Sequence, residues 1–167
     1  MKRIAALVLG LIVLGCQESE HPAGEFTGNE VSYALQAGSV YIISGVATFK
    51  ERKDGSATVS ISLTGTEGTK QLPVHLHLGD VGEADVDVAA LLNPINATTG
   101  ESETILTQLA DETAISYNDL IDLNACIKIH LAETGPDRDI ILAAGNIGVA
   151  ALNTASGRAG IGVCRSN

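Results

Sequence analysis

The chain has 167 residues, of which 45% are hydrophobic, only 3% are aromatic and 18 are glycine. Its formal net charge of −10 is opposite in sign to that of a typical nucleic-acid-binding protein, so the composition excludes nucleic acid as an expected partner. The length suits one domain once the N-terminus is set aside. Short runs of Val, Ile, Leu and Ala separated by glycines favour many short strands over a few long helices.

The N-terminus has the pattern of an export signal. Met1-Lys2-Arg3 is basic, and the apolar run from Ile4 to Leu14 is too short to span a membrane. Val13-Leu14-Gly15-Cys16 then resembles the bacterial lipobox. That resemblance implies a signal peptide over residues 1–15 and acylation of Cys16, palmitate included. We therefore expect a lipid-anchored protein of the bacterial cell envelope, held at the outer membrane on its periplasmic or surface face.

A tether follows the anchor. Residues 17–29 are polar, acidic and contain Gly and Pro, so residues 16–29 are expected to be the lipidated cysteine and a flexible linker, with His21 as a solvated linker residue. The folded domain is then expected over residues 30–167. Cys126 and Cys164 remain for this exported domain and predict one disulfide, the alternative being two separate reduced thiols.

The chain in order predicts about eight strands and one short helical segment. Alternating or apolar runs indicate strands, Asp54-Gly55 is a hairpin signal, residues 93–100 are turn-rich, and residues 116–123 have a capped helical pattern. The expected strands cover residues 30–35, 39–50, 56–64, 72–80, 84–92, 103–110, 126–132 and 158–164, and residues 139–148 contain a further apolar run. This arrangement predicts an all-β fold, an antiparallel Greek-key β-sandwich of immunoglobulin-like or dismutase-like type.

Residues 72–80 carry the main candidate for chemistry. Val74, Leu76 and Leu78 alternate with His75 and His77, so the two imidazoles project from one face of the predicted strand. A third histidine, His130, lies on a later predicted strand, again opposite in phase to the apolar residues. If the apolar residues form the core, all three histidines lie on the outer face of the sheet, under a loop.

Three in-phase histidines suit copper or zinc, with water or an acid completing the site. The alternative is a set of polar residues on a solvated strand face. Lys128 shares the phase of His130, and its positive charge argues against a bound cation. Five acids lie near enough in sequence to be candidate fourth ligands, and no spacing selects one: Asp80, Glu83, Asp85, Asp87 and Asp139.

Residues 44–148 resemble a CHRD (chordin-type) domain. The matching parts in chain order are Ser44–Phe49, Ser56–Leu63, His75-Leu-His-Leu-Gly79, Asn118–Leu123 and Ile127-Lys-Ile-His130. The later Asn-Pro-Gly-Gly-Glu-Ile-Arg-Gly stretch of that family is replaced here by Glu133–Ile141. The resemblance implies an extracytoplasmic β module that acts as a binding or structural unit, with an envelope protein as a possible partner.

The chain has a fainter similarity to copper/zinc superoxide dismutase. His75-Leu-His77, Ile129-His130 and Gly157–Cys164 resemble segments of that family. Its bridging histidine and further zinc histidines have no counterpart here, and its catalytic arginine has none in a recognisable place. We therefore expect a metal-binding or structural envelope module more than an enzyme. A divergent dismutase-like activity is the alternative.

Overall fold

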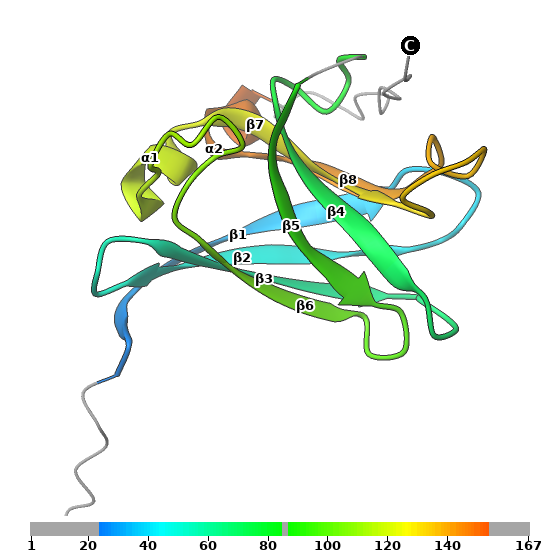
Figure 1. Ribbon diagram of the computed structural model, residues 1–167, viewed down its shortest axis with the longest axis horizontal. Helices are drawn as coiled ribbons and strands as arrows, with labels where there is room; N and C mark the ends of the chain where they lie inside the picture. The colour runs from blue at the N-terminus through cyan, green and yellow to red at the C-terminus, as the bar shows by residue number, and fades with distance from the viewer. Residues whose placement is uncertain (1–23, 85–86, 154–167) are drawn as a thin grey trace, which may run out of the picture.

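The computed structural model describes residues 24–84 and 87–153 of the chain. These residues form eight strands and two short helices, and every paired strand runs antiparallel to its neighbour (Figure 1). The all-β prediction is therefore confirmed. The elements are β1 (Phe26–Ala37), β2 (Ser44–Arg52), β3 (Ala57–Thr64), β4 (Gln71–Leu78), β5 (Val88–Asn96), β6 (Glu101–Leu106), α1 (Tyr117–Ile121), β7 (Asn124–His130), β8 (Ile141–Ile147) and α2 (Gly148–Asn153).

The strands form one closed barrel in the order β1-β2-β3-β6-β5-β4-β7-β8, with β8 returning to β1. This corrects the prediction of a plain sandwich. The two seams that close the barrel are short. Strands β1 and β8 share two residue pairs, Gln36 with Ala144 and Ala37 with Ala143, and β5 meets β6 at Asn96 and Glu101. The barrel thus consists of two four-stranded halves joined along narrow edges.

A glycine permits a close approach of the two halves. A Cβ at Gly145 of β8 would lie 2.2 Å from the backbone oxygen of Ala34 in β1. No other residue fits there without displacing the strand. The sequence pattern marks both halves as amphipathic strands, but it does not contain this contact, so it could not separate an open sandwich from a closed barrel.

The interior of the barrel is filled by aliphatic side chains from both halves. Val74 and Leu76 of β4 and Ile127 and Ile129 of β7 belong to this core, and each is at most 1% exposed. Phe49 is the largest of the fully buried side chains. The alternation predicted for β4 and β7 therefore holds at these four residues, whereas Leu78, at the end of β4, is exposed.

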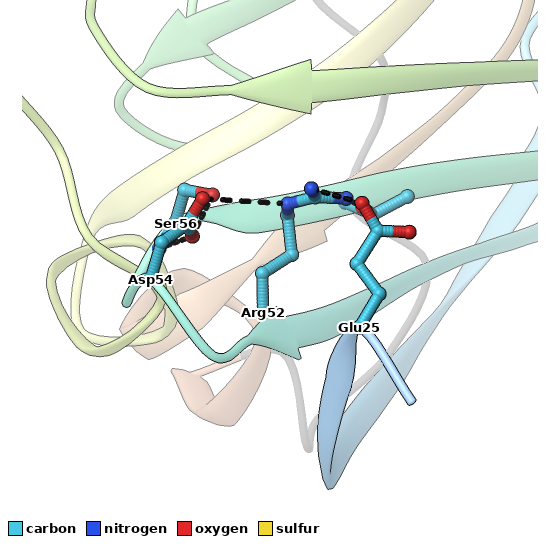
Figure 2. Close-up of polar contacts among 5 residues, drawn as sticks. Glu25, Arg52, Asp54 and Ser56 are labelled. Carbon is cyan, nitrogen blue, oxygen red and sulfur yellow. Dashed lines mark hydrogen bonds and ion pairs between the residues drawn. The ribbon is translucent and has the colours of Figure 1, made fainter. Parts of the chain in front are cut away.

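The first strand begins four residues earlier than the predicted domain boundary at Glu30. Phe26 lies against Lys50 and Arg52, each cation being 6.0 Å from the ring centroid. Figure 2 shows Arg52 between two acids: it pairs with Glu25 and lies 3.8 Å from Asp54. These contacts explain why residues 26–29, predicted as linker, form part of β1.

The same close-up shows the β2–β3 hairpin turn. Asp54 accepts hydrogen bonds from the backbone nitrogen of Ser56 at 2.9 Å and from its hydroxyl at 2.6 Å (Figure 2). Gly55 has a φ of 84°, a conformation that favours glycine. The Asp-Gly turn signal at residues 54–55 is confirmed.

Other element boundaries differ from the sequence-based expectation. Residues 39–43 form a loop before β2, and residues 93–96 continue β5, where the Asn93 side chain bonds to the Glu103 carbonyl at 2.7 Å. The predicted helical segment is confirmed as α1, whose N-cap Ser116 and Asp119 form a reciprocal capping box. Helix α2 was not predicted. The strand expected over 158–164 lies outside the described residues.

Neither of the two helices in the described residues is long and apolar enough to cross a membrane.

Candidate metal centre

The three histidines of the domain meet at one place. His75, His77 and His130 each offer a ring nitrogen, and these nitrogens all lie within 4.8 Å of one another. The ring centroids of His75 and His130 are 4.6 Å apart, and that of His77 lies 5.7 Å from His75 and 6.3 Å from His130. Within the described residues this is the single group of histidine, cysteine or acidic side chains with such spacing.

Strand register explains why residues distant in sequence meet. His75 of β4 lies opposite Lys128 of β7, and His77 lies opposite Cys126. His130 is two residues further along β7, so it is a diagonal neighbour of His75 on the same face. Diagonal positions in antiparallel strands are close enough for large side chains to touch. The sequence predicts on which face of its strand each histidine lies, but it does not predict how β4 and β7 are paired.

The histidine face is the outer face of the barrel, as predicted, yet it is largely covered. His77 is 1% exposed and His130 is 4% exposed, and His75 is half-buried. Beside them a small second cluster packs outside the barrel: Val81, Cys126, Ile141 and Ala144.

Two loops provide the cover. The β4–β5 loop is fastened by Asn146, whose side chain accepts from the Val81 backbone at 2.6 Å and donates to Asp80 at 2.5 Å. It is fastened again by the fully buried Lys128, which donates to the Glu83 carbonyl at 3.3 Å. The β7–β8 loop lies over His130 through Arg138. Both loops are thus bonded to residues of the outer face that carries the imidazoles, and the β7–β8 loop contacts His130 directly.

The hydrogen bond of His130 fixes which of its nitrogens can bind a ligand. Its Nδ1 lies 2.8 Å from the Arg138 carbonyl oxygen. A carbonyl only accepts, so Nδ1 carries the proton and Nε2 holds a lone pair. That Nε2 is buried and has no hydrogen-bond partner among the residues that the structure describes. A ring held by a carbonyl at one nitrogen and open at the other is the arrangement that metal-binding histidines adopt.

The surroundings favour the neutral form of two of the rings, those of His75 and His130. The pKa of His75 is lowered to about 4, mainly by burial and then by the charges of His130, His77 and Arg138 in that order. Burial also lowers the pKa of His130, against the opposing effect of its bond to the Arg138 carbonyl. A neutral imidazole keeps its lone pair at pH 7 and is the form that binds metals.

Sequence reasoning did not find the role of Arg138. Its carbonyl orients His130, and its charge contributes to lowering the pKa of both His75 and His130. A backbone carbonyl leaves no trace in a residue pattern, so no sequence signal could have identified the first role. Lys128 was noted for its charge, but its burial and its bond to the loop were not predicted.

The candidate acids do not join the cluster. Asp80 is bound to Asn146, and no side-chain oxygen of Asp80, Glu83, Asp87 or Asp139 belongs to the group of close ligand atoms. Asp85 lies outside the described residues. The donor set of the described part of the chain is therefore three imidazoles, a set that suits copper or zinc.

Two further site predictions remain predictions. Cys16, the expected lipidation site, and Cys164, one half of the expected disulfide, lie outside the described residues. Cys126 is fully buried on the outer side of β7, in the same phase as His130.

Comparison of the chain with protein-family models, with curated proteins and with solved structures found no match.

Proposed function

We propose that this protein binds one copper or zinc ion through His75, His77 and His130. The observation that carries the proposal is the convergence of three ring nitrogens within 4.8 Å, from two strands of the barrel. His130 adds direct support, because its Nδ1 is held by a carbonyl while its buried Nε2 is open. The donor chemistry fits the metal, since all three ligands are imidazoles in surroundings that lower the pKa of His75 and His130.

The site needs only a small adjustment to hold an ion. Imidazole nitrogens lie about 2.0–2.1 Å from zinc, so two of them on one ion are roughly 3.3–3.6 Å apart. The three nitrogens lie within 4.8 Å of one another, so rotation of the imidazole side chains would have to bring them closer together. Three protein ligands also leave one coordination position for water or another small ligand.

The wider role we propose is a binding or structural module of the cell envelope, of CHRD type, anchored by lipid at Cys16. The order of elements supports it: a barrel that begins at Phe26 follows directly after a segment with the composition of a tether. The strand order also supports Greek-key connectivity, because β4, β5 and β6 follow one another and β7 returns to lie beside β4.

Metal loading of residues 17–167 tests the proposal. The protein is incubated with copper or zinc, dialysed, and analysed for bound metal. We expect one ion per chain, and its loss in His75→Ala. His21→Ala is the matched control, since His21 lies in the predicted tether, and it should retain the metal. Absence of stoichiometric metal, or full retention by His75→Ala, would sink the proposal.

A second candidate is a dismutase-like activity of the copper-loaded protein. Arg138 favours it, because its positive charge acts on both His75 and His130 and would attract an anion such as superoxide to that side of the cluster. Superoxide turnover well above that of free copper, lost in Arg138→Gln, supports this candidate. Turnover at the free-copper level removes it.

A further inference from the structure

One end of the barrel carries an exposed apolar loop beside a pocket. The loop joins β1 to β2, and its residues Val40 and Ile42 are 91% and 89% exposed. The loop is held in place from below: at Gly65, in the neighbouring β3–β4 loop, a Cβ would lie 2.5 Å from the Ile42 carbonyl oxygen. Two large aliphatic side chains therefore project into solvent from a supported backbone.

The pocket next to this loop has apolar walls and a charged rim. Its volume is about 310 Å³. Buried or partly buried aliphatic side chains line it, and exposed Glu67 and Lys70 stand at its edge. The aliphatic lining residues are Ile43, Leu72, Leu131 and Leu142, together with Ile42 of the loop itself at the edge of the pocket. A pocket of this kind accepts a branched aliphatic side chain, and the neighbouring loop displays one.

We propose that this end of the barrel is the contact between two copies of the chain, with Ile42 of each copy filling the pocket of the other. The projecting side chain and the pocket lie side by side on one molecule. A two-fold axis between them places each projection in the opposite pocket, and such a contact closes on itself as a dimer. The proposal does not rest on the metal site.

The charges on the rim fit the same arrangement. Glu67 and Lys70 have opposite signs, and no ion pair within the described chain engages either. In a two-fold contact Glu67 of one copy faces Lys70 of the second copy, and the pairing occurs twice. This local complementarity offsets the repulsion expected between two chains that each carry a net charge of −10.

A lipid surface fits this end of the barrel less well. The loop follows the end of β1, whereas the chain arrives from its N-terminal side at Phe26, at the other end of that strand (Figure 1). Twelve residues of strand separate the two ends by roughly 40 Å. The net charge and Glu67 also oppose contact with anionic headgroups. A second copy satisfies the pocket and both rim charges, which a headgroup layer does not.

Analytical ultracentrifugation of residues 17–167 tests the contact, because all eight strands of the closed barrel lie within this range. The contact is small, so we expect a weak dimer that forms between ~10 μM and ~1 mM. Ile42→Ser should weaken association at least ten-fold. Ile105→Ser is the matched control, since Ile105 is 53% exposed on β6, away from the pocket, and it should leave association unchanged.

Charge reversal tests the two-fold pairing. Glu67→Lys and Lys70→Glu should each weaken association, and the double variant should restore it, because the opposite charges again face each other. A protein that stays monomeric to ~1 mM overturns the proposal. Equal effects of Ile42→Ser and Ile105→Ser, or a double reversal no better than the singles, overturn it too. Binding to anionic vesicles that Ile42→Ser abolishes, without self-association, would assign the loop to lipid instead.

Discussion

The two faces of β4 are buried to a similar extent by different means. On the inner face, Val74 and Leu76 are each 1% exposed and pack against the aliphatic core of the barrel. On the outer face, His77 is also 1% exposed, but the cover there comes from two loops. Burial on the inner face rests on apolar area, whereas burial on the outer face rests on a few polar bonds from Asn146, Lys128 and His130.

The contrast explains how one strand can serve both stability and chemistry. Apolar burial is non-directional, and a polar atom without a hydrogen bond would be costly there. The inner face therefore carries only apolar side chains and forms part of the core. The outer face excludes water with loops and leaves ring nitrogens directed at one another. Changes on the inner face should therefore alter stability and spare the metal site, whereas changes to the histidines of the outer face should remove the metal.

The largest effect is expected from Leu76→Ala, on the inner face. Loss of a fully buried leucine should lower the free energy of unfolding by about 2–5 kcal/mol. Leu78→Ala is the matched control on the same strand, since Leu78 is 41% exposed, and it should cost less than ~1 kcal/mol. Urea unfolding measures both, and metal stoichiometry should stay unchanged. Loss of metal from folded Leu76→Ala protein would show that the two faces are not independent.

The next effect is expected from Asn146→Ala, which unfastens the β4–β5 loop. Asn146 is 8% exposed, and its removal leaves the Val81 backbone N–H without its acceptor. We expect a loss of about 1–3 kcal/mol and faster amide exchange at Val81. Asn93→Ala removes an exposed asparagine whose side chain makes one hydrogen bond, to the Glu103 carbonyl, and it should cost less. Equal destabilisation by the two variants would contradict the role assigned to Asn146.

A pH dependence should follow from the histidine cluster. The pKa of His75 is about 4 in the folded protein and that of His130 is also lowered, while both return to about 6.5 in the unfolded chain. Between these values the unfolded state binds more protons, so the metal-free protein is most stable above ~pH 7 and loses stability as the pH falls.

Between ~pH 6.5 and ~pH 5 we expect a loss of about 1–2 kcal/mol, allowing for the water that reaches part of the His75 ring. Carboxylates with lowered pKa, such as Asp54 and Asp119, contribute below this range. Urea unfolding across the range measures the slope, and His75→Gln should flatten it. An unchanged slope in that variant would contradict the lowered pKa of His75 as its source.

The smallest effect is expected from Arg138→Gln. The substitution leaves the backbone carbonyl that holds His130 and removes only the charge of an exposed side chain. Because that charge repels a metal cation, affinity should rise by about 2–3-fold at low salt and return to the wild-type value at ~0.5 M salt. Competition with a chelator measures it, with Lys53→Gln in the β2–β3 turn as the control. A ten-fold weakening would mean that the side chain itself organises the cluster.

The sequence predicted the all-β class and the faces of β4 and β7, because alternation at Val74–Leu78 and Ile127–Leu131 follows directly from strand geometry. It did not predict closure of the barrel. Closure depends on the contact of Gly145 with β1 and on two short seams, and these are long-range pairings that no local pattern contains.

The candidate site was predictable to a similar degree. Its three ligands were found from their phase, but their convergence depends on the register of β4 against β7, which is set by the whole barrel. The Arg138 carbonyl that holds His130 belongs to a loop with no regular pattern, so its role appears only in three dimensions.

X-ray absorption at the metal edge of the copper- or zinc-loaded protein tests the central claim most directly. We expect a first shell that contains three imidazole nitrogens at about 2.0–2.1 Å, with one imidazole fewer in His130→Ala. The same variant should fold as a closed barrel, since its altered side chain lies outside the core. A first shell of oxygen alone, or a spectrum that His130→Ala leaves unchanged, would contradict a metal site at His75, His77 and His130.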